Sequence, residues 1–247
     1  IKRSPLCGRN FEYFSEDPIL AGRMAAGLVD GIQSTGTAAC PKHFAVNSQE
    51  LRRMASDSIV DERTMREIYL TGFEIVCRAA KPRAIMSSYN LVNGTYAHEN
   101  KHLLTDILRT EWGFDGMVIS DWGGSNSAVE AARAGGSLEM PAPGLAGARQ
   151  IVEAVENGRL DASDVYARAQ EVLTVAAASA GLPAPTPYDL DEHHALATRI
   201  ASEAITLLRN EDDLLPLSAG TSVALIGDLA DMPRFQGSGS SQVNPTR

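Results

Sequence analysis

The chain has 247 residues, of which 44% are hydrophobic, and its formal net charge is −9. This length allows one large hydrophobic core and part of a second, and the acidic balance, with both signs mixed along the chain, argues against a nucleic-acid partner. No apolar stretch approaches the roughly 20 residues that a membrane-spanning helix needs, so no membrane partner is expected either.

Helical and strand-like patterns alternate through the first part of the chain. Asp17 is a candidate N-cap, and Pro18 fits the first turn of the helix that follows. Short apolar runs predict buried strands, and amphipathic runs predict helices. The expected order is helix 18–33, strand 37–44, helix 61–80, strand 84–90, helix 102–112, strand 116–122, helix 125–134 and strand 137–141. Such alternation predicts an α/β fold with a parallel sheet, open or closed into a TIM-type (β/α) barrel.

The pattern changes in the second part of the chain. Two more helices are expected over 146–157 and 162–180, and the proline-rich run LPAPTPYD predicts a linker. A helix over 192–209 and the apolar run VALIGD, which has the pattern of a first strand, indicate a second α/β unit. The expected domains are 1–181, a linker over 182–191, and the start of a second domain over 192–247.

Only four barrel-like strands are predicted, where a closed barrel of this type has eight. The first residue is Ile rather than Met. Both ends of the parent protein are therefore expected to be missing, and the cellular location is left open. The three cysteines, Cys7, Cys40 and Cys77, have no metal-ligand spacing and are expected to be free thiols.

Polar side chains gather at the carboxyl ends of the predicted strands, the edge where barrel enzymes place their active sites. These residues are Lys42 and His43, Tyr89 and Asn90, Asp121 and Trp122, and Glu139. A single polar strand end is explained by its approach to solvent. Four in succession favour a site.

Asp121 fits the nucleophile of a retaining glycosidase, a reaction that uses two carboxyl groups about 5 Å apart. It ends the apolar run MVIS, and Trp122 follows with an indole that can contact the apolar face of a sugar ring. The competing interpretation makes Asp121 the N-cap of the next helix.

The other candidates are less specific when each is taken alone. Lys42 and His43 offer a positive charge next to a hydrogen-bonding ring. Arg3 and Arg53 could donate forked hydrogen bonds to sugar hydroxyls. Met86 and Tyr89 could line a pocket, but they also fit a core. The histidines lack metal-ligand spacing and no nucleotide-binding glycine motif occurs, so neither a metal nor another cofactor is expected.

Several segments together closely resemble, in order and spacing, the barrel domain of family 3 β-glucosidases. They are KRSPLCGRNFEYFSEDP, CPKHFAVNSQE, DERTMREIYLTGFE, MSSYNLVNG, LLTDILRTEWGFDGMVISDW and LEMP, with LLRNEDDLLPL and VALIGD further on. The resemblance implies the C-terminal portion of a barrel, a linker and the beginning of an α/β sandwich domain. It also implies a retaining, exo-acting β-glycosidase whose substrate is a small glucoside or an oligosaccharide.

The resemblance assigns roles to particular positions. Asp121 corresponds to the catalytic nucleophile, and the sugar subsite corresponds to Arg3, Lys42, His43, Arg53, Met86, Tyr89 and Trp122. The general acid is expected beyond residue 247 and a sugar-binding aspartate before residue 1, so the chain alone is expected to be inactive. Ser137 stands where aspartate commonly precedes LEMP, which leaves the local hydrogen bonding open.

Three alternatives remain at this point. The form KHFAVNSQE, in place of the KHFPGHG of related hexosaminidases, favours a glucosidase or a β-xylosidase. A non-catalytic carbohydrate-binding remnant is the second possibility, and a barrel enzyme with His43 as general base is the third. The oligomeric state is open.

Overall fold

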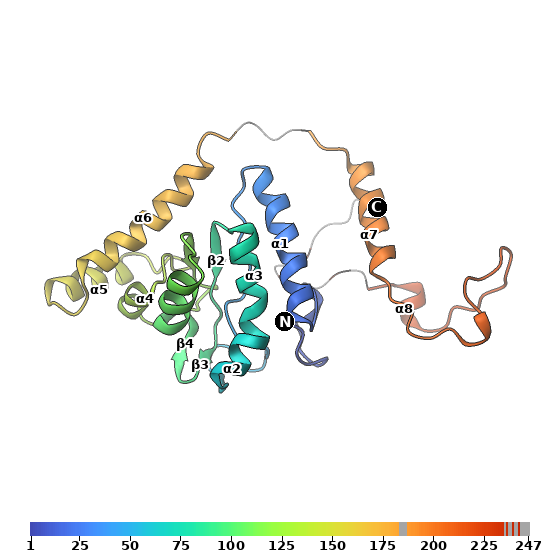
Figure 1. The fold of residues 1–247 in the computed structure, drawn as a ribbon, viewed down its shortest axis with the longest axis horizontal. Helices are drawn as coiled ribbons and strands as arrows, with labels where there is room; N and C mark the ends of the chain where they lie inside the picture. The colour runs from blue at the N-terminus through green and yellow to red at the C-terminus, as the bar shows by residue number, and fades with distance from the viewer. Residues whose placement is uncertain (183–186, 235, 237–238, 240–241, 243–247) are drawn as a thin grey trace. The chain divides into compact units, whose positions relative to one another are not determined.

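The computed structural model describes residues 1–182, 187–234, 236, 239 and 242. The chain divides into two compact units, Ile1–Leu182 and Pro183–Arg247 (Figure 1). Within the described residues, no helix combines the length and apolar character that a membrane crossing requires.

The first unit is built on a short parallel sheet. Strand β2 (Ala84–Met86) pairs in parallel with β5 (Met117–Ile119). The segment 39–44 runs along the other edge of β2, where Ala84 N donates to Ala39 O at 3.2 Å and Phe44 N donates to Met86 O at 2.8 Å. Leu138 lies on the far side of β5 through a parallel bridge to Ile119. The four expected strands thus lie side by side in chain order.

Only the two inner segments are regular strands. The outer ones have a neighbour on one side alone, and Pro41 has no N–H with which to continue a ladder. Within the described part of the chain, the expected barrel is therefore seen as four adjacent parallel segments with intervening helices. The α/β fold class is confirmed at that level.

A second small sheet was not expected. Strand β1 (Asp57–Ser58) pairs in parallel with β3 (Leu91–Val92), which pairs antiparallel with β4 (Thr95–Tyr96). Asn93 and Gly94 join β3 to β4 with φ angles of 51° and 87°. Positive φ at both central residues is the requirement of a type I′ hairpin turn, which explains the Asn-Gly pair.

Most helices begin and end close to their predicted positions. Helix α1 (Pro18–Ser34) is capped by Asp17, which accepts from the amides of Ile19 and Leu20, as predicted. The stretch expected at 61–80 is continuous but divided into α2 (Glu62–Thr64), a π-helical segment η2 (Met65–Leu70) and α3 (Thr71–Ala80). The remaining helices of this unit are the 3-10 helices η1 (Asn10–Glu12) and η3 (Ala97–Glu99), the π-helical η4 (His102–Glu111), α4 (Ala128–Ala134), α5 (Leu145–Glu156) and α6 (Ala162–Ser179).

The core lies between the sheet and the helices. Phe44, Ile85 and Val118 from the sheet are completely buried and pack in one cluster with side chains of η4. Helices α1 and α3 lie side by side (Figure 1). Gly22 permits this approach, because a Cβ there would come within 2.9 Å of the Ile75 side chain. This packing holds the sheet rigid beneath its polar edge.

The second unit departs from expectation in two places. Helix α7 (Leu190–Ala204) is capped by Asp189 but ends before the predicted residue 209, because Ile205 adopts an extended conformation. The strand predicted at VALIGD is wrong: residues 223–226 form no strand, and Val223, Leu225 and Ile226 are exposed. A buried strand needs neighbours for its ladder and both its faces, and the described residues of this unit provide none. Its other helices are η5 (Glu211–Asp213) and α8 (Asp228–Asp231), and residues 183–186 of the predicted linker lie outside the described residues.

Candidate active site

Asp121 lies directly beyond the carboxyl end of β5. Its Oδ1 accepts a hydrogen bond from the backbone N–H of Trp122 at 2.8 Å. Helix α4 is capped by Ser127, whose hydroxyl accepts from Glu130 N. The interpretation of Asp121 as the N-cap of this helix is therefore wrong, and the carboxylate is available for another purpose.

His43 is the nearest ionisable partner of Asp121. The separation of His43 Nε2 and Asp121 Oδ2 is 3.3 Å, and the two side chains are only 1% and 11% exposed. Both atoms are shielded from solvent, and neither forms a hydrogen bond of good geometry within the described residues. Since well-formed N–H···O bonds are 2.7–3.2 Å long, the pair is in contact but leaves bonding capacity unused.

Tyr13 holds the other side of the His43 ring. Its hydroxyl lies 3.0 Å from His43 Nδ1, and the two rings meet edge to face at 86°. Burial raises the pKa of Tyr13, so its hydroxyl keeps its proton. The imidazole is thus fixed between a phenol and a carboxylate that come from distant parts of the chain.

The surroundings of His43 keep it neutral. Burial is the largest cause, and the positive charges of Arg9, Lys42 and Arg53 add to it, so that the pKa of His43 falls to about 2. A positive imidazolium would have to lose its hydration and approach other cations. The ring therefore acts as a neutral hydrogen-bonding group in the physiological pH range.

Arg53 and Tyr89 form a second part of the site. The Arg53 guanidinium carbon lies 4.5 Å from the centre of the Tyr89 ring, a favourable cation–π geometry. Burial is the largest cause of a raised pKa for Tyr89, and the nearby charge of Asp121 adds to it. Arg53 is held by Glu50, whose Oε2 is 3.0 Å from Nη1.

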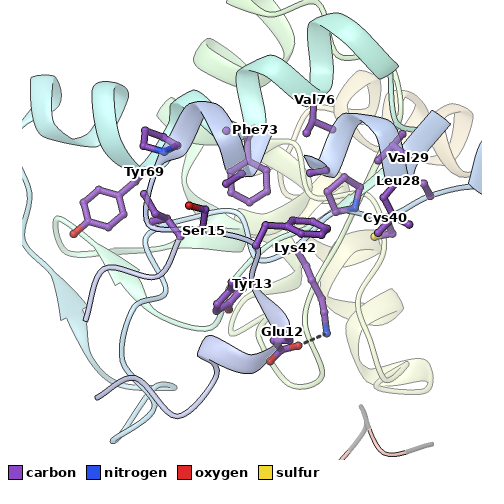
Figure 2. A pocket seen from close by; sticks show the side chains of 18 of the residues that line it. Glu12, Tyr13, Ser15, Leu28, Val29, Cys40, Lys42, Tyr69, Phe73 and Val76 are labelled. Atoms are coloured by element: carbon purple, nitrogen blue, oxygen red, sulfur yellow. Dashed lines mark ion pairs between the residues drawn. The ribbon is translucent and has the colours of Figure 1, made fainter. Parts of the chain in front are cut away.

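Lys42 points to a different partner from its neighbour His43. Its Nζ lies 3.4 Å from Glu12 Oε2, and Figure 2 shows the long side chain extended toward that carboxylate. Glu12 also pairs with Arg9, which lies 4.0 Å from Glu50. Alternating acids and bases therefore line this side of the site.

The predicted residues are not all brought together. His43, Asp121, Tyr89 and Arg53 converge, and Trp122 projects beside Asp121 with 52% of its surface exposed. Met86 ends β2, partly buried, opposite Ile119. Arg3 is exposed, and among the described residues no side chain pairs with it. Sequence reasoning missed Arg9, Glu12, Tyr13 and Glu50, although the dense mixture of charges and aromatic residues in GRNFEYF was a signal.

A larger hollow lies on the other side of the segment 39–42. It has a volume of about 250 Å³ and is lined mostly by apolar residues, which come from the N-terminal segment, α1, the segment 39–42, η2 and α3 (Figure 2). Neither Asp121 nor Trp122 borders it. Sugars require convergent polar groups, so this hollow is a poor candidate for a sugar site. Cys40 borders it as an unpaired thiol, and Cys7 and Cys77 are also free, as predicted.

Ser137 anchors the segment next to β5. Its hydroxyl accepts from Val118 N at 2.9 Å and donates to Glu171 Oε2 at 2.5 Å. Glu171, on α6, also accepts from Arg109 and Arg168. The hydrogen bonding left open by the sequence is thus completed by a carboxylate from a later helix, and it secures the strand that carries Asp121.

The parallel α/β fold, and the carboxylate, imidazole, guanidinium and indole that it brings together, fit the class of glycoside hydrolase domains. Residues 1–175 match the glycosyl hydrolase family 3 N-terminal domain. The chain belongs to this family.

Two curated relatives match the whole chain. The thermostable β-glucosidase B of Acetivibrio thermocellus is 50% identical over 248 residues, which are 100% of this chain and 33% of the relative. The exo-α-(1→6)-L-arabinopyranosidase of Bifidobacterium breve is 43% identical over 258 residues, 100% of this chain and 34% of the relative. The chain spans about a third of the length of these relatives.

Solved structures agree with this assignment. β-Glucosidase 3B from Thermotoga neapolitana, determined in complex with α-D-glucose, has a TM-score of 0.94 and 41% identity, over 100% of this chain and 36% of that one. The family 3 β-glucosidase of Bifidobacterium adolescentis has a TM-score of 0.91 and 43% identity, with the same coverage.

Proposed function

We propose that the full-length protein containing this chain is a retaining, exo-acting β-glycosidase that removes terminal β-D-glucosyl residues, with Asp121 as nucleophile. An Asp121 oxygen forms a bond to the anomeric carbon while the glycosidic C–O bond breaks, and the leaving oxygen takes the electron pair and a proton from a general acid. Water then attacks the same carbon, its proton passes to the conjugate base of that acid, and the bond to Asp121 breaks. Two inversions give net retention.

The observation that carries this proposal is the environment of the Asp121 carboxylate. It stands at a strand end, one oxygen is oriented by the Trp122 amide, and the other lies against His43 without a completed hydrogen bond. A carboxylate that only stabilised the fold would have its buried oxygens paired. An oriented oxygen with free capacity suits a nucleophile.

His43 is poorly suited to the rival role of general base. A base works best with a pKa near the working pH, and burial among cations lowers the pKa of His43 to about 2. As a neutral ring beside Asp121 it suits a sugar-binding donor. Arg53, Tyr89 and Trp122 complete the same subsite in this proposal, with Lys42, Met86 and Arg3 at its border.

The domain organisation is part of the proposal. Residues 1–181 form the C-terminal portion of a TIM-type barrel, residues 182–191 a linker, and residues 192–247 the start of an α/β sandwich domain. The four adjacent parallel segments in chain order support a barrel, because consecutive parallel strands joined by helices are its repeating unit.

The sugar has one specific competitor to glucose. The Bifidobacterium breve relative is an exo-α-(1→6)-L-arabinopyranosidase, so a pentopyranoside is the second candidate substrate. β-Xylosides belong to the same size class. Comparing hydrolysis of aryl β-D-glucoside, β-D-xyloside and α-L-arabinopyranoside by the full-length protein distinguishes these candidates.

Covalent labelling tests the nucleophile. A 2-deoxy-2-fluoroglucoside with a good leaving group should label the full-length protein, and the label should map to the peptide that contains Asp121. Asp121→Ala should abolish labelling. Glu139→Gln is the matched control, because Glu139 is a partly buried carboxyl group at the next strand end and burial raises its pKa. This variant should still be labelled. A label on another residue would refute the assignment.

A further inference from the structure

The hydrogen atoms around His43 can be counted from the geometry. Neutral imidazole carries one N–H, on either Nδ1 or Nε2, and the other nitrogen accepts. Nε2 lies 3.3 Å from Asp121 Oδ2, and a carboxylate only accepts. A lone pair on Nε2 would face the lone pairs of that oxygen. The single N–H therefore belongs on Nε2.

This placement determines the direction of the hydrogen bond on the opposite side. With its proton on Nε2, His43 presents a lone pair at Nδ1, and the Tyr13 hydroxyl lies 3.0 Å from that atom. Tyr13 must then donate. Among the described residues no other side chain lies at hydrogen-bond distance from Nδ1, so the phenol alone satisfies it.

We propose that Tyr13 is a positioning residue that donates to His43 Nδ1, selects the neutral tautomer with its proton on Nε2, and so leaves an Nε2–H beside Asp121 for a sugar hydroxyl. The edge-to-face ring contact holds the imidazole plane as well. Among the described hydrogen bonds, Tyr13 is joined to His43 and not to Asp121, so it acts on Asp121 and the sugar only through His43. The kinetic part of this inference rests on the proposed glycosidase function, and the tautomer does not.

The charges around His43 and the donated hydrogen bond act in the same direction on the ring. Arg9, Lys42 and Arg53 disfavour imidazolium, whereas Asp121 favours it. Glu12 and Glu50 reduce the effect of those cations through their ion pairs. A donor on Nδ1 stabilises the neutral form directly, because protonation of that nitrogen would break the bond. Tyr13 thereby opposes proton uptake next to a carboxylate that must remain free to react.

Nitrogen NMR of the resting full-length protein measures the tautomer directly. With 15N-labelled histidine, and with His43→Gln to assign the signals, His43 should show a protonated, pyrrole-type Nε2 and an unprotonated Nδ1 from pH 5 to pH 8. A proton on Nδ1 in the unmodified protein would overturn the proposal. This measurement needs no substrate and no variant of Tyr13.

Two matched variants test the role of the hydroxyl. Tyr13→Phe keeps the ring contact and removes the donor, so the Nδ1 signal should move and His43 should begin to take up a proton at a higher pH than in the unmodified protein. Tyr69→Phe removes a hydroxyl from a small hollow that Tyr69 lines together with Tyr13 and His43, and among the described hydrogen bonds none joins Tyr69 to His43. It should leave the His43 spectrum unchanged. Equal spectra for both variants would refute the assignment.

Kinetics separate positioning from simple packing. Tyr13→Phe should lower kcat/KM for the best aryl glycoside by about 2- to 10-fold at pH 7, the factor associated with one neutral hydrogen bond, and by a similar factor from pH 5 to pH 8, because burial and neighbouring cations keep the ring neutral there. Tyr69→Phe should have an unchanged pH profile. An altered tautomer with unchanged kcat/KM at every pH would contradict the positioning role. If the glycosidase proposal were wrong, the fluoroglucoside would not label Asp121, but the His43 spectrum would still show the proton on Nε2.

Discussion

Replacing Glu171 with Gln tests whether a charged cluster beneath the sheet supports the strand that carries Asp121. Glu171 is 12% exposed and receives Arg109 at 2.9 Å and Arg168 at 2.6 Å, whose side chains are 13% and 14% exposed. The Ser137 hydroxyl donates to the same carboxylate. Removing its charge leaves two nearly buried guanidinium groups without an anionic partner.

The expected cost follows from that burial. Breaking a buried ion pair by removing one partner costs about 3–5 kcal/mol, and because Gln retains one accepting oxygen we expect about 3 kcal/mol. The backbone N–H of Val118 donates to Ser137 Oγ, so its hydrogen exchange reports opening at this place even when other domains unfold separately. A loss of about 3 kcal/mol corresponds to roughly 100-fold faster exchange.

Glu67→Gln provides the matched control. Glu67 pairs with Arg63 at 3.0 Å, but these side chains are 59% and 81% exposed. Exposed pairs contribute about 0–1 kcal/mol, so exchange at Val118 should change little. If Glu171→Gln accelerated exchange no more than Glu67→Gln, the cluster would not support β5.

Two further predictions concern packing and sugar binding. Gly136→Ala should destabilise the fold by about 1–3 kcal/mol, because its Cβ would lie 2.5 Å from the buried His98 Nε2. Gly27→Ala on α1 should stabilise the fold by up to about 1 kcal/mol, because nothing lies within 4 Å of the added Cβ. Thermal unfolding measures both changes, and a shift of the same sign for the two variants would contradict the reasoning. Trp122→Ala should raise KM by about 2- to 10-fold through lost ring contact and leave the melting temperature unchanged, since Trp122 is 52% exposed; an unchanged KM would remove Trp122 from the proposed subsite.

Local signals predicted the helices well. Asp17 before Pro18 marks the start of α1, because capping depends on a few adjacent residues. The predictions failed where the outcome depends on distant partners. VALIGD has a strand-like composition, but a strand forms only when other strands complete its hydrogen bonds.

The same distinction applies to the site. The family resemblance assigned Asp121, His43, Tyr89 and Arg53 to one site, although Tyr89 and Arg53 taken alone were unspecific, and the structure brings the four together. Residue patterns alone could not decide between a helix cap and a free carboxylate for Asp121. That choice required the position of Ser127, which caps α4 instead.

Residue types and their spacing were sufficient to predict an α/β fold and an acidic group at a strand end, and the resemblance of several segments indicated a glycosidase family. They did not show that Tyr13, thirty residues away, bonds to His43, or that Lys42 faces Glu12 rather than the carboxylate beside its neighbour. Hydrogen-bond direction and pKa depend on distances of a few ångströms and on exclusion of water. Those quantities exist only once packing has brought distant segments together.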